Sequence, residues 1–340
     1  MFFTLNLFRT PFSLLLSLSS LDLVLNSTGH APVALDDVFI NATDNCESVD
    51  VSLNTTLFTC ASVGTNTLLI TALDVAGNQD TDVVTVTVAD NSPPALDALS
   101  AITLQLDTNG EVDVLPTDVI NTDSDNCAVT SRTLAQSHFT CAHVGSQDVL
   151  LTIADAQDNQ AQANISVLVQ DSVNPLLTTA PYLQLTLDAT HGNASIDADD
   201  TTLSTSDNCQ VNNQTLSQAS FQCAHLGNNT ITTTTYDVNG NSNASTTVVE
   251  VVDAHVPNLV VRPTLTLELD AAGLGVIDAD NLTTSVTDNC AVAAHTINQT
   301  AFACADVGAT IPVLVSAQDT SEVQPSRARG IPIILLRLKD

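Results

Sequence analysis

The stretch SDNCAVTSRTLAQSHFTCAHVG, residues 124–145, contains two cysteines fourteen positions apart, Cys127 and Cys141. An Asp-Asn pair precedes the first cysteine, a Phe lies two residues before the second, and a Gly follows four residues after it. Taken alone, this stretch is compatible with a metal site, a redox site, a thiol nucleophile beside a histidine, or a disulfide staple. The rest of the sequence helps to separate these alternatives, because the same stretch occurs four times.

The chain is a tandem array of four copies with a step of 81 or 82 residues. Each copy contains an [ST]-D-N-C motif followed by an F-x-C-A-x-[VL]-G segment, and later a turn of the D-x-x-G-N type that breaks down in the fourth copy to DTSEV. Self-similarity at a fixed period is the signature of a repeat architecture. The eight cysteines of these motifs are Cys46, Cys60, Cys127, Cys141, Cys209, Cys223, Cys290 and Cys304.

Alternating apolar and polar residues run through each copy, as in ITLQL at 102–106 and VVTVTV at 83–88. This period of two predicts half-buried antiparallel strands, and about seven short strands fit in each copy. The fold class that follows is all-β, with tandem immunoglobulin-like β-sandwiches. A Pro follows the last Asp of each of the first three copies within a few residues, so the linkers are short and predict an elongated rod.

The repeat spacing sets the expected domain boundaries. Residues 1–19 are apolar with one Arg and read as a secretion signal segment. Repeats are expected at 20–92, 93–173, 174–255 and 256–340, and the last is either truncated or closed by an atypical strand from the tail IPIILLRLKD.

The composition excludes two classes of partner. The chain has 38 acidic residues, of which only five are Glu, against 7 Lys and Arg, so its net charge is −31. This charge repels nucleic-acid backbones and anionic lipid surfaces. We expect no nucleic-acid partner, and no stretch predicts a membrane span. Only 3% of the residues are aromatic and none is Trp, so the cores must be built mainly from aliphatic residues.

The cysteine motifs do not fit catalysis or zinc binding. A structural zinc site needs clustered pairs of ligands, and a redox motif needs C-x-x-C, which is absent. His143 lies two residues after Cys141, but the matching positions in the other copies are Ser62, His225 and Asp306, which share only polarity. No catalytic residue is therefore assigned, and a disulfide is the expected role of all eight cysteines, in an oxidising, extracellular location.

The combined motifs resemble the hyalin-repeat (HYR) family and the related bacterial immunoglobulin-like repeats. This resemblance covers residues 20–320 and implies β-sandwich domains of secreted or surface proteins associated with adhesion or matrix architecture. Many members of the family carry a further Cys after the D-x-x-G-N turn, which this chain lacks. The resemblance then implies one disulfide within each repeat, with the Phe of the F-x-C motif packed beside the sulfurs. The implied pairs are Cys46–Cys60, Cys127–Cys141, Cys209–Cys223 and Cys290–Cys304, and the phenylalanines are Phe58, Phe139, Phe221 and Phe302.

Aspartates recur at fixed positions in the linkers and turns. One interpretation is turn chemistry, because Asp accepts backbone N–H bonds in tight turns. The other is Ca²⁺ bound at the repeat junctions, which would need several of these oxygens to converge. The candidate ligands are the linker residues Asp90, Asp171 and Asp253 and the turn residues Asp74, Asp155 and Asp237.

The function predicted from these observations is that of a non-catalytic extracellular or cell-surface spacer or adhesion module. Two alternatives stay open: a module that binds carbohydrate or protein ligands, and an accessory array of a larger secreted enzyme. The expected partners are surface or matrix proteins or glycans, and the expected cofactor, if any, is Ca²⁺.

Overall fold

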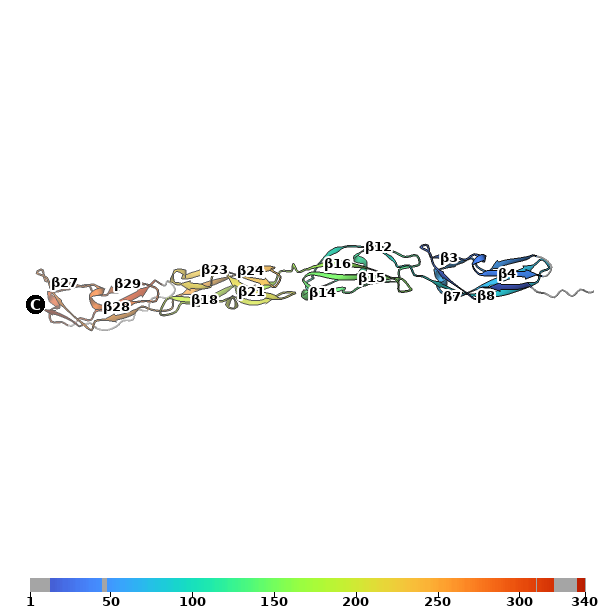
Figure 1. The fold of residues 1–340 in the computed structure, drawn as a ribbon. Helices are drawn as coiled ribbons and strands as arrows, with labels where there is room; N and C mark the ends of the chain where they lie inside the picture. Colours follow the sequence, from blue (N-terminus) through green and yellow to red (C-terminus); the bar gives the residue numbers. More distant parts are fainter. Residues whose placement is uncertain (1–12, 45–47, 310, 321–334, 340) are drawn as a thin grey trace, which may run out of the picture. The chain divides into compact units, whose positions relative to one another are not determined.

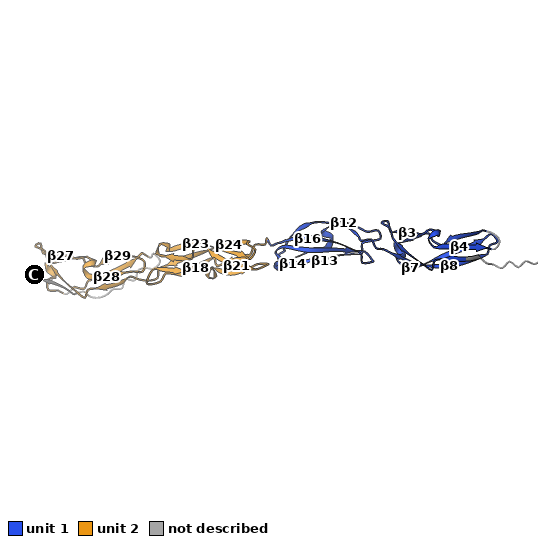
Figure 2. Cartoon of the chain, in the orientation of Figure 1, with its two compact units in different colours: residues 1–171 blue, residues 172–340 orange. Residues whose placement is uncertain are grey.

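The computed structural model describes residues 13–44, 48–309, 311–320 and 335–339, whose fold is shown in Figure 1. The chain divides into two compact units, residues 1–171 and 172–340 (Figure 2), and each unit contains two of the four repeats. The prediction of an all-β chain of tandem immunoglobulin-like sandwiches is confirmed, since strands dominate every repeat.

The second repeat illustrates how the strands are arranged. A four-stranded sheet has the order β10-β16-β15-β13, in which β10 runs parallel to β16 and the other neighbours are antiparallel. Two further pairs, β9 with β12 and β11 with β14, complete the sandwich. The strands are β9 (Ala95–Ala98), β10 (Ala101–Gln105), β11 (Glu111–Asp113), β12 (Ile120–Ser124), β13 (Ser131–Leu134), β14 (His138–Thr140), β15 (Gly145–Ala154) and β16 (Gln160–Gln170).

The first and third repeats have the same pairing. Their four-stranded sheets are β2-β8-β7-β5 and β18-β24-β23-β21. The first repeat contains β1 (Ser13–Ser17), β2 (Ser20–Val24), β3 (His30–Pro32), β4 (Phe39–Asp44), β5 (Val49–Leu53), β6 (Leu57–Thr59), β7 (Gly64–Asp74) and β8 (Gln79–Ala89). The third contains β17 (Leu176–Thr179), β18 (Tyr182–Thr186), β19 (Asn193–Ser195), β20 (Thr202–Ser206), β21 (Val211–Leu216), β22 (Ser220–Gln222), β23 (Gly227–Asp237) and β24 (Ser242–Val252).

The fourth repeat follows this plan with separate strand pairs, β25 with β28, β26 with β32, β27 with β30 and β29 with β31. Its strands are β25 (Asn258–Val261), β26 (Thr264–Glu268), β27 (Leu274–Val276), β28 (Thr283–Thr287), β29 (Val292–Ile297), β30 (Ala301–Ala303), β31 (Val315–Asp319) and β32 (Leu335–Lys339). Helical segments are single turns: η1 (Leu35–Asp37), η2 (Cys60–Ser62), η3 (Pro116–Asp118), η4 (Cys141–His143), α1 (Ala198–Thr201), η5 (Cys223–His225), α2 (Ala279–Leu282) and η6 (Cys304–Asp306).

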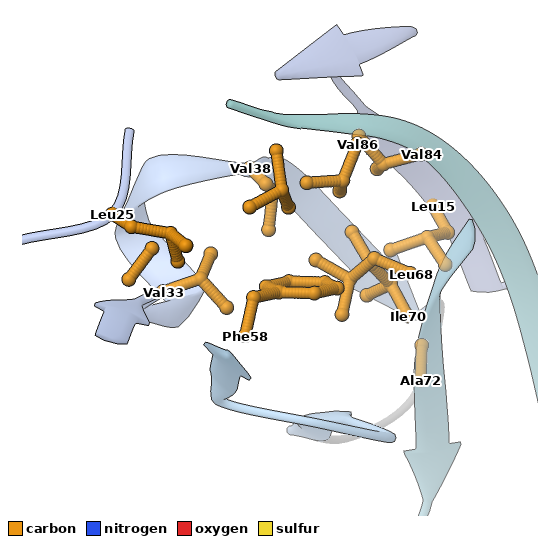
Figure 3. Close-up of a cluster of buried hydrophobic side chains, with 12 residues drawn as sticks. Leu15, Leu25, Val33, Val38, Phe58, Leu68, Ile70, Ala72, Val84 and Val86 are labelled. Atoms are coloured by element: carbon orange, nitrogen blue, oxygen red, sulfur yellow. The ribbon is translucent and has the colours of Figure 1, made fainter. Parts of the chain in front are cut away.

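Each core is aliphatic around one phenylalanine, as the composition predicts. In the first repeat, Phe58 is 4% exposed and lies among Val33, Leu68 and Ile70 (Figure 3). Cys60 and Cys127 pack against the same cluster. The alternation of the sequence explains the core, because every second residue of a long strand such as β7 points inward.

Strand β1 packs in the first sandwich. It pairs antiparallel with β4, and Leu15 is buried in the first core, so the sandwich includes residues before the expected start at residue 20. Residues 1–12 of the predicted signal segment lie outside the described residues. In the fourth repeat, β32 pairs parallel with β26, as β16 does with β10.

Candidate functional site at the repeat junctions

The disulfides join consecutive repeats and do not staple single ones. Cys60 is bonded to Cys127 in the first unit, and Cys223 to Cys290 in the second, each across a sequence separation of 67 residues. Cys141 and Cys209 also take part in disulfides, whereas Cys304 is a free, exposed cysteine. Cys46 lies outside the described residues. All four predicted pairs within repeats are therefore wrong.

The path of the chain explains this error. In the second repeat, Thr130 donates its backbone N–H to the carbonyl of Ala154, so Cys127 lies near the end of β15. Cys141 lies just before Gly145, where β15 begins. A ten-residue strand spans about 30 Å, whereas bonded cysteines need Cα atoms within about 7 Å. The two cysteines of the second repeat therefore lie at opposite ends of its sandwich, and Cys127 faces the first repeat.

A glycine makes room for each junction. Gly29 adopts φ +73°, and a Cβ there would lie 2.6 Å from the carbonyl oxygen of Asn126 and 2.7 Å from Cys60 Sγ. Gly192 repeats this arrangement in the second unit, with φ +63° and the carbonyl oxygen of Asn289 at 2.6 Å. Both the left-handed backbone and the close approach require glycine.

Asp90 directly follows β8, at the start of the linker between the first and second repeats. Its side chain is buried, and its Oδ1 accepts hydrogen bonds from the backbone N–H of Ser92 at 3.1 Å and from Asn126 Nδ2 at 3.1 Å. The first bond forms the turn that begins the linker, and the second connects the linker to the next repeat. The Oδ2 atom is buried without a hydrogen-bond partner among the described residues.

The D-N-C motif of the second repeat supplies the next two side chains. Asp125 Oδ2 accepts the backbone N–H groups of Cys127 at 2.8 Å and Ala128 at 3.0 Å. Asn126 Nδ2 also donates to the carbonyl of Asn26 in the first repeat, at 3.2 Å. Asp125 Oδ1 and Asn126 Oδ1 are both buried, and neither has a partner in the described part of the chain.

Asp155 comes from the D-x-x-G-N turn after β15 and is 3% exposed. Its Oδ1 accepts from the backbone N–H of Asn159 at 2.9 Å, and its Oδ2 accepts from Asn159 Nδ2 at 2.7 Å. The same Nδ2 donates to the carbonyl of Asp90 at 3.0 Å, so the turn also contacts the linker. Asp158 adopts φ 63° at the position where the turns of the first and third repeats have glycine.

These residues form a compact acidic cluster. One carboxylate oxygen from each of Asp90, Asp125 and Asp155 lies within 4.8 Å of the others. The ion pairs found among the described residues involve Arg132, His138, His191 and His295 and include none of these three aspartates. Three carboxylates in a partly dehydrated space repel one another, so the arrangement is suited to a cation with oxygen ligands.

The junction in unit 2 has the same design. Asp253 is 3% exposed, and its Oδ1 accepts from His255 N at 3.0 Å and from Asn289 Nδ2 at 3.1 Å. Asp288 Oδ1 accepts from Cys290 N at 3.0 Å. Burial, followed by repulsion from Asp253 and Asp319, raises the pKa of Asp288 above its ordinary value. Asp253 Oδ2, Asp288 Oδ2 and Asn289 Oδ1 are buried without a partner from the described residues.

The structure sorts the predicted calcium ligands. Asp90 and Asp155 converge with Asp125, and Asp253 neighbours Asp288 and Asp319. Asp74 holds its own turn, since it accepts from Asn78 N at 2.8 Å and Asn78 Nδ2 at 2.7 Å, and it belongs to no carboxylate group found among the described residues.

The remaining two predicted ligands, Asp171 and Asp237, belong to different units. Asp171 follows β16 and is partly buried. Asp237 ends β23, is 1% exposed and binds Asn241 as Asp155 binds Asn159. The D-N-C aspartates are not in the predicted ligand list, but Asp44, Asp125, Asp207 and Asp288 recur in all four copies, and the sequence leaves open whether they also hold a cation.

The polar residue two positions after the second cysteine of each copy has a structural role. His143 Nδ1 accepts the backbone N–H of Thr140 at 3.0 Å. Three other side chains accept from the backbone three residues earlier in the same way: Ser62 from Thr59, His225 from Gln222 and Asp306 from Ala303. The shared polarity of this position is thus explained by one hydrogen bond, and because Cys141 is disulfide-bonded it is not a thiol nucleophile.

Comparison with known proteins adds little beyond this geometry. No protein-family model matches the chain, and no curated protein matches it. Among solved structures, extracellular cadherin domains 1–5 of protocadherin gamma B2 are 14% identical, with 95% of this chain and 80% of that chain covered and a TM-score of 0.31. Immunoglobulin domains 1–5 of sidekick-1 are 10% identical, with 94% and 79% covered and a TM-score of 0.30. These likenesses are weak, and the fold assignment rests on the strands described above.

Within the described residues, every helix is too short to cross a membrane.

Proposed function

We propose that this chain is a non-catalytic extracellular or cell-surface array, of the hyalin-repeat type, that acts as a disulfide-linked spacer or adhesion module. The observation that carries the proposal is the pair of covalent junctions, Cys60–Cys127 and Cys223–Cys290. A disulfide between consecutive domains transmits load from one to the next. Such bonds persist in oxidising compartments, which supports an extracellular location.

The hydrogen bonds at the junction support the same role. Asn126 connects the second repeat to Asn26 and Asp90 of the first, and Asn289 makes the equivalent bonds to Asp188 and Asp253. Adjacent sandwiches are therefore fixed by side chains as well as by sulfur, as a spacer requires. The partners that we propose for the array are surface or matrix proteins or glycans, and the proposed cofactor is Ca²⁺.

Force spectroscopy on the full chain tests this function. When the ends are pulled, each disulfide shields the residues that it encloses, which would otherwise add roughly 20 nm of extension. We expect the oxidised chain to release less length than a Cys60→Ser/Cys127→Ser variant, by about this amount. Equal extension of the two chains, or unfolding of the oxidised chain at forces that an unlinked array resists, would contradict the spacer role.

A further inference from the structure

We propose that the described junction of each unit binds one Ca²⁺ between its two repeats, and that the disulfide across the junction holds this site in its binding geometry. The inference rests on the proposed function only in that both concern the same junctions. In unit 1 the ligands are Asp90, Asp125, Asp155 and the side-chain carbonyl of Asn126.

The acidic cluster alone does not define a site, but its unpartnered oxygens point to a ligand. Asp90 is 3% exposed, and its Oδ2 is buried with no hydrogen-bond partner among the described residues. Asp125 Oδ1 and Asn126 Oδ1 are also buried atoms with no hydrogen-bond partner among the described residues. A buried carboxylate oxygen without a compensating partner destabilises the fold, whereas a bound cation compensates all three atoms at once.

The hydrogen bonds of the junction leave these oxygens available. Asp90 is held through Oδ1 by Ser92 and Asn126, and Asp125 is held through Oδ2 by Cys127 and Ala128, so each carboxylate is fixed by one oxygen and keeps the other. Asn126 donates with Nδ2, which leaves its Oδ1 as an acceptor. Groups fixed in this way need little reorganisation to bind an ion.

The second unit reproduces the pattern with different residues. The unpartnered atoms are Asp253 Oδ2, Asp288 Oδ2 and Asn289 Oδ1, which are the linker Asp and the D-N-C pair of the next repeat. If these aspartates only stabilised turns, the hydrogen bonds to their bonded oxygens would be explained. The lack of partners for the other buried oxygens, at equivalent positions in both units, would not be explained.

The ligand chemistry favours Ca²⁺ over the other common divalent ions. All the ligands are carboxylate or amide oxygens, which suit hard cations and not zinc or copper. Ca²⁺ accepts six to eight oxygens in flexible geometry, with water as part of the set, whereas Mg²⁺ demands a near-ideal octahedron. Ligands drawn from a linker, a loop and a turn fit the flexible ion better.

The disulfide fixes the ligands from the second repeat. Cys127 N donates to Asp125, and Cys60 Sγ lies 3.6 Å from the carbonyl oxygen of Asn126. The Cys60–Cys127 bond therefore anchors the D-N-C loop against the first repeat, where Asp90 lies. Loss of groups that position metal ligands typically weakens affinity about 10- to 100-fold, and we expect an effect of this size here.

The first experiment is calorimetric titration of the oxidised, chelator-treated full chain with CaCl2. Asp155→Asn is compared with Asp74→Asn, because both residues begin a D-x-x-G-N turn but only Asp155 belongs to a carboxylate cluster. We expect Asp155→Asn to lose one bound ion per chain and Asp74→Asn to lose none. Asp90→Asn, which leaves the turn of the second repeat untouched, should lose the same ion. Unchanged stoichiometry in both cluster variants, or an equal loss in all three, would refute the site.

The second experiment tests the coupling to the disulfide. Cys60→Ser/Cys127→Ser should weaken Ca²⁺ binding at its own junction by about tenfold or more, while Cys304→Ser should leave every site unchanged. Unaltered affinity in the double variant would overturn the coupling. A chain that binds no Ca²⁺ but still shows disulfide-limited extension under force would disprove this inference and leave the spacer role standing. A chain that binds Ca²⁺ at its junctions but extends as far as the Cys60→Ser/Cys127→Ser variant would support this inference and contradict the spacer role.

Discussion

Cys60 of the first repeat is bonded to Cys127 of the second, and Gly29 lies so close to this bond that a Cβ would be 2.7 Å from Cys60 Sγ. The bond closes a loop that contains the whole of the first repeat's last two strands, β7 and β8, and about half of the second repeat. Stability of the two repeats is consequently coupled, and variants at the junction should affect both.

Removing the Cys60–Cys127 bond should destabilise unit 1. By the chain-entropy estimate, a loop of this length contributes about 4 kcal/mol, and the variant Cys60→Ser/Cys127→Ser should lose up to this amount in denaturant unfolding. Cys304→Ser is the control, because Cys304 forms no disulfide. Identical unfolding midpoints for the double variant and the control would show that the bond does not stabilise the fold.

The close approach at Gly192 can be separated from its backbone conformation. Gly192→Ala places a Cβ 2.6 Å from the carbonyl oxygen of Asn289 in addition to the left-handed strain, whereas Gly227→Ala meets the strain alone, since nothing lies within 4 Å. Strain costs about 1–2 kcal/mol, and Gly192→Ala should exceed this value. Equal losses of unfolding free energy in the two variants would mean that the junction tolerates the extra atom.

His143 should be replaceable by serine but not by alanine. His143→Ala removes the acceptor of the Thr140 N–H and should cost about 1 kcal/mol in thermal or denaturant unfolding. His143→Ser introduces the residue that makes the equivalent bond at position 62, and it should retain most of the stability. A serine variant as unstable as the alanine variant would argue against the hydrogen bond as the reason for polarity at this position.

Acid should weaken the fold through the turn aspartates. The pKa of Asp107 is held below its ordinary value of 3.8 by hydrogen bonds from the Glu111 and Asn109 backbones, and that of Asp188 is lowered by the His191 and Thr190 backbones. A lowered folded-state pKa contributes stability that is present above pH 3.8 and is lost as pH falls through the lower, folded-state value. Asp107→Asn should flatten this decline when unfolding free energy is measured against pH, and an unchanged slope would contradict it.

Cys304 should be the reactive thiol of the described residues. It is free and exposed, and its Sγ lies 3.7 Å from the carbonyl oxygen of Gly273, the same relationship that Cys60 has with Gly29. Alkylation of the native, unreduced chain followed by peptide mass spectrometry should label Cys304 and spare Cys60, Cys127, Cys223 and Cys290. Labelling of any of these four would contradict the cross-junction pairs.

The fold class and the repeat follow from the sequence alone. Alternation in runs such as VVTVTV predicts strands because side chains of a strand point to opposite faces, and the fixed step of the motifs predicts identical sandwiches. The buried phenylalanines were equally predictable, since each copy has one Phe in its F-x-C motif and few other aromatic residues. These properties depend on local pattern and composition.

The tertiary structure alone decided which cysteines pair and which aspartates converge. The family resemblance implies that Cys127 meets Cys141, but β15 separates them by its full length, and the partner comes from the preceding repeat. Asp90 likewise meets Asp125 and Asp155 only because the end of one sandwich abuts the start of the next. Contacts between repeats depend on which loops reach the same end of a sandwich, and a linear pattern does not contain that information.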